Sequence, residues 1–211
     1  MGTYQNGILG SFNGKVGPIV GANWKDVNYM RSKGRKTTKG PSLKQLEHRV
    51  KFSLVSKFVH KIGALLMKYY PATSELTSIN HAFANIYGKA ITGAYPLFEL
   101  DYSRILISRG ELHNCGVPQV RLTGNGMIEF SWIDNTDNLM ANADDRCLVL
   151  VYCPEMRQCV YTNTGSIRKV GKENMNASYF TGKLVETWIT FISADDKIAA
   201  TSIYTGQFMI V

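Results

Sequence analysis

The spacing of apolar residues changes near residue 96, and this change restricts the fold more than any other feature of the sequence. Over residues 42–91, apolar residues recur every three or four positions, as on one face of an α-helix. After the change, they alternate with polar residues in short runs that are typical of half-buried β-strands. The sequence therefore predicts an α+β chain, with a helical region first and an antiparallel β region second.

The β region, residues 96–211, consists of short apolar runs separated by turn signals, among them residues 124–126 and 195–196. Closely spaced short strands of this kind predict an antiparallel β-sandwich of the immunoglobulin or fibronectin type III kind. Strand alternation directs Trp132 and Trp188 inward, which argues against an aromatic platform for sugars. The apolar residues 208–211 predict a final strand docked on this domain.

Two helices are expected within residues 41–95. The first covers residues 42–70, where Ser42 is suited to be the N-cap and Gln45 completes a capping box. The second covers residues 74–91 and follows after a short turn. Two consecutive amphipathic helices with a short connection predict an antiparallel helical hairpin that precedes the β-sandwich.

Residues 1–40 are rich in glycine and end in a basic linker, and we expect extended structure there. Glycine destabilises a helix interior by about 1 kcal/mol relative to alanine, and Pro18 lies in the middle of the segment. The Asn-Gly pair at residues 13–14 predicts a two-residue hairpin turn, and the Lys-Asp pair at residues 25–26 predicts a second turn. The segment is therefore expected to form a small β arm.

An arm of this size cannot bury enough apolar surface to be stable alone. It either closes onto its own chain or completes the sheet edge of a neighbouring subunit. In the second case the glycines allow two backbones to approach closely, while aromatic side chains fill pockets of the neighbour. The residues expected in this assembly contact are Phe12, Gly14, Val16, Gly17, Val20, Gly21, Trp24 and Tyr29.

Positive charge is concentrated in the first part of the chain. Residues 1–60 contain 11 Lys or Arg and 2 Asp or Glu, whereas residues 61–211 contain 13 and 14, which gives net charges of +9 and −1. This asymmetry indicates an anionic partner, a neighbouring subunit with an acidic face, or an arm that needs solubility. The residues expected to bind a polyanion, from the linker and one face of the first helix, are Arg31, Lys33, Arg35, Lys36, Lys39, Arg49, Lys57, Lys61 and Lys68.

Motifs for catalysis, nucleotides and metals are not found in the sequence. It contains no Walker A loop, no G-x-G-x-x-G, no G-x-S-x-G and no H-E-x-x-H. Asp134, Thr136, Asn138 and Asp145 have the offsets of a calcium loop, but Leu139 occupies the position where an EF-hand requires glycine. We therefore expect a polar loop there, no cofactor or metal, and no enzymatic activity.

The four cysteines, Cys115, Cys147, Cys153 and Cys159, form no C-x₂-C pair, which argues against a metal site. We expect reduced thiols that pack as small hydrophobic side chains. Cys147 and Cys153 are expected to share a strand face. Cys153 and Cys159 flank a predicted hairpin turn and could face each other, which leaves open a disulfide if the protein is part of an exported particle.

Membrane and export signals are also not expected. The sequence has no apolar run of about 18 residues, and its start has neither the basic nor the apolar part of a secretory signal. We therefore expect synthesis in the cytoplasm without a signal peptide. The mature protein then stays there or becomes part of a virion or an extracellular assembly.

The N-terminal stretch GSFNGKVGPIVGANWKDVNYMRS resembles the signature of an uncharacterised Bacteroidota family of unknown function. Later stretches, among them LKQLEHRVKFSLVSKFV and FSWIDN, are also similar to that family, so the resemblance covers most of the chain. Asn13 and Asp26 depart from the signature without changing the expected turns. The residues that match it are Gly14, Lys15, Val16, Gly17, Gly21, Trp24, Lys25, Tyr29 and Arg31. The resemblance implies that the arm is a unit, but it implies no activity.

These observations predict three parts: a β arm with its linker (1–40), a helical hairpin (41–95) and a β-sandwich (96–211). The leading hypothesis is a non-enzymatic structural protein that self-assembles into a homo-oligomer through its arm, as a virion-like or filament-like subunit. The alternative is sequence-tolerant binding of nucleic acid by the basic N-terminal third. A third hypothesis is a sandwich whose loops bind a glycan or a protein.

Overall fold

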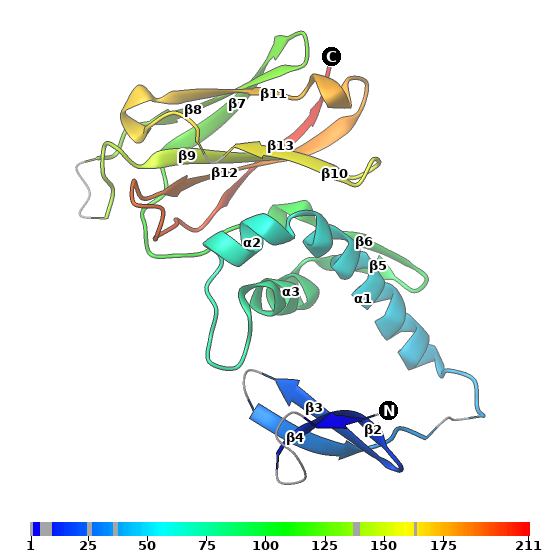
Figure 1. Ribbon diagram of the computed structural model, residues 1–211. Coiled ribbons are helices and arrows are strands. Elements are labelled where there is room, and N and C mark those ends of the chain that lie inside the picture. Colours follow the sequence, from blue (N-terminus) through cyan, green and yellow to red (C-terminus); the bar gives the residue numbers. More distant parts are fainter. Residues whose placement is uncertain (1, 5–9, 25–26, 36–37, 137–139, 163) are drawn as a thin grey trace. The chain divides into compact units, whose positions relative to one another are not determined.

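The computed structural model describes residues 2–4, 10–24, 27–35, 38–136, 140–162 and 164–211 (Figure 1). The chain divides into two compact units, Met1–Ser42 and Leu43–Val211. Both contain antiparallel sheets, and the second also contains the three α-helices, so the predicted mixture of helices and antiparallel strands is confirmed. Among the described residues, no helix is both long and apolar enough to cross a lipid bilayer.

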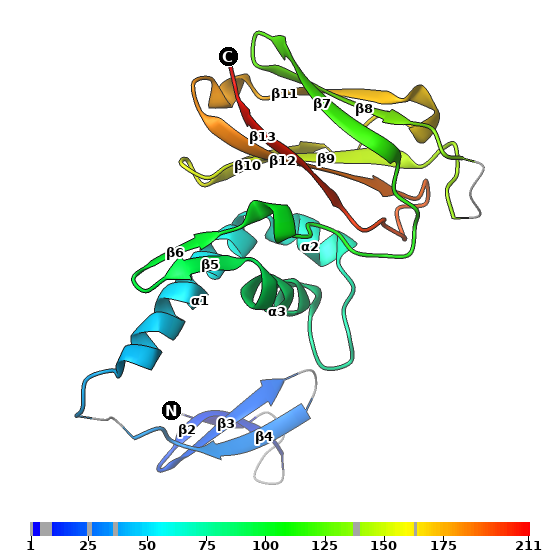
Figure 2. The same cartoon turned by 180° about the vertical axis from the view of Figure 1, so that it is seen from behind.

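Two antiparallel sheets face each other in the larger unit (Figures 1 and 2). The four-stranded sheet has the order β10 (Gln158–Thr162), β9 (Arg146–Cys153), β12 (Leu184–Ile192) and β13 (Ile203–Met209). The three-stranded sheet has the order β11 (Lys172–Asn176), β8 (Met127–Ile133) and β7 (Gly116–Gly124). Short 3₁₀ helices occur at Tyr102–Arg104, Arg168–Val170 and Ser178–Phe180.

The four-stranded sheet is covered on both faces. Val149 and Val151 of β9 pack in the core between the two sheets, whereas Leu148, Leu150 and Tyr152 pack in a second core with the helices. Because side chains alternate between the faces of a strand, covering both faces requires an almost continuous apolar run. This explains the sequence CLVLVYC, which shows no alternation of apolar and polar residues.

The helices lie on the face of the four-stranded sheet that the three-stranded sheet leaves free (Figures 1 and 2). They are α1 (Leu43–Lys61), α2 (Gly63–Tyr69) and α3 (Ser78–Lys89). The sequence predicts one helix over residues 42–70, but the structure divides this range at Ile62, whose φ of −102° and ψ of 13° depart from helical values. Ile62 is fully buried at this break.

The second predicted helix begins later than expected. The Thr77 hydroxyl accepts a hydrogen bond from the Asn80 backbone N–H at 3.3 Å and caps α3, so residues 74–77 form a turn. A small hairpin of β5 (Ile91–Ala94) and β6 (Leu97–Leu100) follows α3. Residues 103–112 belong to the region where short strands are expected, but they form no strand: the segment begins in a 3₁₀ turn, and Leu112 makes an isolated bridge with Ala200.

Several local predictions for the β region are confirmed. Trp132 and Trp188 are both buried, the first between the sheets and the second against the helices. Residues 124–126 form the tight turn between β7 and β8, with positive φ at all three. The last strand is docked as expected, because β13 pairs with β12 and Ile210 is buried.

The cysteines are free thiols, and three of the four are buried. Cys147 and Cys153 share the β9 face that packs between the sheets, as predicted. The expectation that Cys153 and Cys159 could face each other is wrong. Cys159 lies opposite Tyr152, so its side chain points to the helix side, whereas the Cys153 side chain points to the core between the sheets.

The smaller unit is a single antiparallel sheet, in the order β1 (Thr3–Tyr4), β2 (Phe12–Val16), β3 (Ile19–Trp24) and β4 (Val27–Ser32). The turn predicted at residues 13–14 is wrong, because both residues lie inside β2. The loop between β2 and β3 is Gly17-Pro18, and Gly17 has a φ of 56°. A type II′ hairpin turn takes glycine with positive φ first, and the negative φ of proline suits the second place. Residues 25–26, the second predicted turn, lie outside the described residues.

Candidate interaction sites

The first candidate site is the sheet of the N-terminal unit. Phe12 packs directly over Gly21, since a β-carbon at Gly21 would lie 2.1 Å from the Phe12 carbonyl oxygen. Gly14 lies opposite Gly21 in the register. The glycine at position 21 therefore allows a close approach of β2 and β3 that no other residue permits. Of the predicted arm residues, Gly17 lies in the turn and the rest lie in the strands.

Apolar side chains are exposed on both faces of this sheet. Trp24 lies opposite Val27 and next to Tyr29 on one face, and these side chains are 51, 64 and 45% exposed. Val16, Ile19 and Met30 are exposed on the other face. All six residues of β4 are exposed, and β4 is an edge strand of the sheet order. The sheet therefore presents both apolar surface and an edge where a further strand can pair.

The basic residues around this sheet do not form one cluster. Arg31 is on β4, on the face that carries Tyr29. The Lys33 backbone N–H donates to the Pro18 carbonyl at 2.7 Å, which ties the start of the linker to the β2–β3 turn. Arg35 and Lys39 follow on the exposed linker. Lys36 lies outside the described residues.

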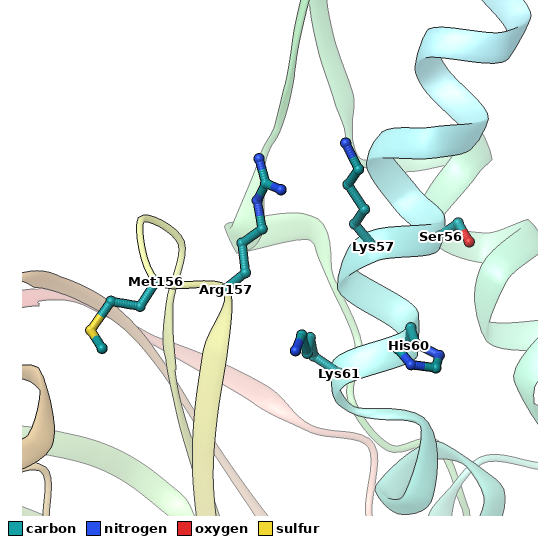
Figure 3. Close-up of a pocket in the computed structure, with 6 residues that line it drawn as sticks. All are labelled: Ser56, Lys57, His60, Lys61, Met156 and Arg157. Atoms are coloured by element: carbon teal, nitrogen blue, oxygen red, sulfur yellow. The ribbon is translucent and has the colours of Figure 1, made fainter.

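The second candidate site is a basic groove in the larger unit, with a volume of about 480 Å³ (Figure 3). One wall is α1, and the other is the turn between β9 and β10. The residues that line it are Ser56, Lys57, His60, Lys61, Met156 and Arg157. The two walls come from segments that are about a hundred residues apart in the sequence.

Packing between α1 and the β9–β10 hairpin positions these side chains. Phe58 of α1 contacts Tyr152 edge-to-face, with ring centroids 4.9 Å apart. The Cys159 thiol donates to the Lys61 carbonyl at 3.5 Å. Arg157 has a φ of 53°, a left-handed conformation that belongs to the tight turn. The turn thus holds Arg157 beside the helix that carries Lys57 and Lys61.

All of the charged side chains that line the basic groove are positive. No acidic residue lines it, and within the described parts of the chain Lys57, Lys61 and Arg157 form no ion pair. Burial raises the pKa of Tyr152 to about 12, and the nearby Arg157 acts in the opposite direction. Burial likewise raises the pKa of Cys159, against the effect of Lys61. An anion entering the groove would meet three positive charges and no carboxylate.

The other two predicted basic residues of the helices lie elsewhere. Arg49 is exposed on α1 but does not line the groove. Lys68 of α2 forms an ion pair with Asp196 in the β12–β13 loop, and that hydrogen bond raises the pKa of Lys68. Asp196 also accepts from the Tyr69 hydroxyl at 3.0 Å and pairs with Arg146 at 3.2 Å. Lys68 therefore links the helices to the sheet.

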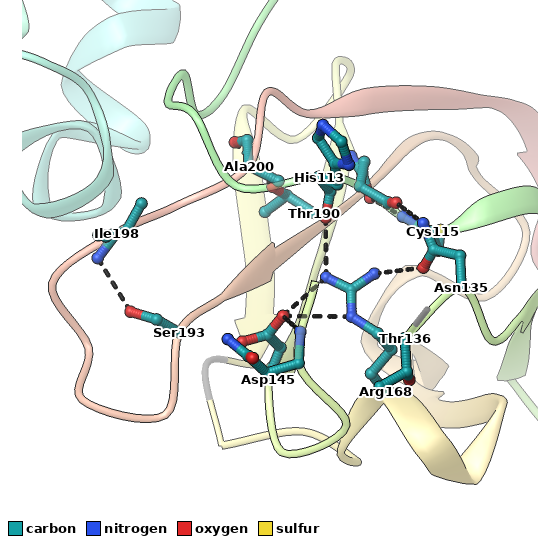
Figure 4. Close-up of polar contacts among 12 residues, drawn as sticks. His113, Cys115, Asn135, Thr136, Asp145, Arg168, Thr190, Ser193, Ile198 and Ala200 are labelled. Carbon is teal, nitrogen blue, oxygen red and sulfur yellow. Dashed lines mark hydrogen bonds and ion pairs between the residues drawn. The ribbon is translucent and has the colours of Figure 1, made fainter. Parts of the chain in front are cut away.

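A buried polar network lies in the other half of the larger unit (Figure 4). The Arg168 guanidinium is fully buried and donates to Asp145 Oδ2 at 3.0 and 3.2 Å, to Asn135 Oδ1 at 2.7 Å and to the His113 carbonyl at 2.8 Å. It also lies 4.2 Å from the centroid of the Phe191 ring. All of the guanidinium contacts are internal, so the network fixes loops to the sheets and leaves no charge for a ligand.

This network uses part of the loop that has calcium-loop offsets. Asp145 is the counter-ion of Arg168, and Asp134 accepts a hydrogen bond from the Thr136 backbone N–H at 3.1 Å. Asn138 lies outside the described residues. Within the described ranges, no three His, Cys, Asp or Glu side chains are grouped so that they could hold a metal ion.

Residues 11–206 match the sequence profile of DUF6266, a family of unknown function. The chain belongs to this family. Neither a comparison with curated proteins nor one with solved structures gave a match. The DUF6266 match begins just before β2 and ends within β13, so it includes the basic groove and, except for β1, the sheet of the N-terminal unit.

Two residues of this DUF6266 protein were missed by the sequence analysis. Arg157 follows the run CPEM in a tight turn, and nothing in its neighbourhood indicates that it lies beside a helix. Arg168 looks like a surface residue in the run SIRKVGK, although its side chain is fully buried. Only the tertiary pairing of distant segments gives these two arginines their neighbours.

Proposed function

We propose that this protein is a non-enzymatic structural subunit that self-assembles, in a virion-like or filament-like particle, through its N-terminal unit. The observation that carries this proposal is the exposure of apolar side chains on both faces of a single-layer sheet with an open edge at β4. An isolated two-stranded hairpin is at best marginally stable in water, and a small sheet needs a hydrophobic face or packing against another element for independent stability. Contact with another copy would cover these side chains and stabilise the sheet.

Pairing of β4 with an edge strand of another copy is the mode of contact that we favour. Main-chain hydrogen bonds supply such pairing with much of its affinity, and side chains at alternate positions supply specificity. Trp24, Val27 and Tyr29 form an apolar surface on one face beside that edge. The four-stranded sheet of the larger unit ends at β10 and β13, which gives another copy open edges to offer.

The larger unit also supports a more specific fold assignment, which we propose as fibronectin type III-like. Its sheets β7-β8-β11 and β10-β9-β12-β13 have the strand order of the A-B-E and C′-C-F-G sheets of that topology. We further propose that α1 and α2 form, with α3, the antiparallel helical hairpin that covers the outer face of the second sheet. In the particle this unit would be the rigid body that carries the assembling arm.

The test is the native mass of the full-length protein by size exclusion with light scattering. We expect the wild type to form a discrete or large multimer and the variant W24S/V27K to approach the 23.6 kDa of one chain. The matched control is L97K/Y179S, which makes the same kinds of change at one aliphatic and one aromatic side chain that are exposed on the larger unit. A wild-type monomer, or a multimer unaffected by W24S/V27K, would refute assembly through this sheet.

A second candidate function, sequence-tolerant binding of a polyanion, is favoured by the basic groove. Lys57, Lys61 and Arg157 would contact phosphates and release their counterions, which makes binding strongly dependent on salt. We expect K57A/K61A/R157A to weaken binding of polyphosphate at low salt. The control K44A/K89A/R121A removes the same charge from exposed positions outside the groove. Equal loss in both variants would show that net charge alone, without the groove, is responsible.

A further inference from the structure

A second groove adjoins the basic groove on the other side of α1. It has a volume of about 250 Å³, lies between α1 and α3, and is mainly apolar. The residues that line it are Phe52, Ser56, Val59, His60, Gly63, Ile79, Asn80 and Phe83. Ser56 and His60 line both grooves, so the two form one continuous surface across the helix.

Aromatic rings form the apolar end of this surface. Phe52 is 50% exposed, and its ring centroid lies 4.9 Å from that of Phe83 at an interplanar angle of 48°. Phe83 in turn stacks on Tyr87, with ring centroids 6.0 Å apart. A half-exposed phenylalanine supported from behind by other rings offers a fixed flat face to a ligand.

Apolar and basic side chains lie on different sides of α1. Phe52, Ser56 and His60 are four residues apart, so they follow one ridge of the helix. Lys57 and Lys61 lie one residue further around the helix, on the side of the β9–β10 turn (Figure 3). A chain-like ligand that runs along α1 would therefore meet apolar and aromatic groups on one side and cations on the other.

We propose that the two grooves together bind single-stranded nucleic acid, with a base stacked on Phe52 and phosphates at Lys57, Lys61 and Arg157. This inference rests on the polyanion-binding function proposed above and gives its ligand a class. Single strands combine alternating flat bases with a charged backbone, which is what stacking platforms in basic grooves recognise. In a duplex the bases are paired and stacked on one another, so none is available for Phe52.

The proposal separates base stacking from charge, and the experiment measures both on the full-length protein. The probes are a fluorescent 15-residue oligodeoxythymidine, an abasic oligonucleotide of the same length, a duplex, and polyphosphate as a competitor without bases. We expect the wild type to bind oligodeoxythymidine about tenfold more tightly than the abasic strand, within the range for one stacked base. Its affinity should fall steeply as salt rises.

The variant F52L keeps an apolar side chain but removes the stacking face. We expect it to lose about tenfold in affinity for oligodeoxythymidine and nothing for polyphosphate. The matched control is Y179L, which removes a 65%-exposed aromatic ring that lines neither groove. Thermal melting of each variant establishes that it is folded.

The outcomes distinguish the inference from the function on which it rests. Equal affinity of the wild type for oligodeoxythymidine and the abasic strand, or tighter binding of the duplex, overturns the stacking site while leaving a polyanion groove in place. An unchanged affinity of F52L for oligodeoxythymidine also overturns it. If no probe binds at low salt, both the stacking site and the polyanion function are refuted. The wild-type comparison decides the matter even if F52L does not fold.

Discussion

Each unit of the molecule contains a four-stranded antiparallel sheet, but the two sheets differ in what covers them. In the larger unit it is the central sheet, β10-β9-β12-β13, which lies between the helices and the second sheet. Every residue of β12 after Leu184 is buried, because helices cover one face and a second sheet covers the other. Every residue of β4 is exposed. Both sheets are held by antiparallel strand pairing, while burial of apolar side chains is concentrated in one.

This difference separates two properties of a sheet: hydrogen-bonded pairing of its strands and burial of its apolar side chains. Each backbone hydrogen bond contributes only about 0.5–1.5 kcal/mol net, because the unfolded chain forms hydrogen bonds to water instead. Burial of apolar surface supplies most of the stabilisation, at roughly 25 cal/mol per Å². The central sheet is therefore expected to set the stability of the larger unit, and the N-terminal sheet to have apolar surface available for a partner.

The largest effect is expected from breaking the buried ion pair. R168M leaves the Asp145 carboxylate buried without its cation, and removal of one partner of such a pair typically destabilises by about 3–5 kcal/mol. Urea unfolding followed by tryptophan fluorescence measures this loss. The control K183M removes the cation of an exposed pair with Glu155 and should leave the transition in place. A small effect of R168M would mean that this network contributes little to the fold.

Shortening a buried side chain on either face of β9 tests whether both faces of the central sheet are packed. L150A opens a cavity on the helix side, and V151A opens one between the sheets. Each should lower the free energy of unfolding of the larger unit, and for L150A we expect a loss of about 2–5 kcal/mol. V27A, at a 64%-exposed position of the N-terminal sheet, should leave the same unfolding transition unchanged. The comparison between the two sheets fails if only one of L150A and V151A lowers the free energy of unfolding. It also fails if V27A lowers it as much as either of them.

Alkaline pH should destabilise the larger unit through its buried thiols. Burial raises the pKa of Cys115 from an ordinary 9.0 to about 12, so above pH 9.0 the unfolded chain loses this proton while the folded chain keeps it. The stability contributed by this group is complete below 9.0 and declines by at most about 1.4 kcal/mol per pH unit as the pH rises toward 12.

Urea unfolding at a series of pH values measures this decline, and C115A should make it shallower. Tyr152, whose pKa burial raises from an ordinary 10.0 to about 12, adds to the slope only above pH 10.0. The interval just above pH 9.0 therefore isolates the thiols. If the free energy of unfolding falls equally steeply with pH in wild type and C115A, the raised pKa of Cys115 is not the cause of the decline.

The smallest effect on the larger unit is expected from a change that disrupts the N-terminal sheet. In G21V the new β-carbon would collide with the Phe12 backbone, so β2 and β3 cannot keep their pairing. Amide exchange of residues 12–24 should accelerate, while the unfolding transition of the larger unit stays in place. Position 34, where a β-carbon meets no atom within 4 Å, supplies the control G34A. Retained protection in G21V would refute the close approach of the two strands.

Several patterns that act within a few residues were predicted correctly from the sequence. The alternation of Ile128, Phe130 and Trp132 with polar residues was enough to identify a strand and its inward face, because side-chain direction follows from strand geometry alone. The helical period also located the two predicted helical ranges, although it did not reveal the break at Ile62 that divides the first into α1 and α2. The Asn-Gly turn was not, since it competes with Gly17-Pro18 only a few residues later and local signals do not rank the two.

By itself, the sequence determined the regions of helix and strand, the separate N-terminal arm and the excess of positive charge in the first 60 residues. Only the tertiary structure decided that β9 is covered on both faces, that Lys68 pairs with Asp196, and that Arg157 joins Lys57 and Lys61 in one groove. The period of apolar residues indicates which side of a helix or strand is apolar, because the residues that form one side are only two to four positions apart in the sequence. Which distant segments share a cavity depends on how whole layers pack, and no short stretch of sequence contains that information.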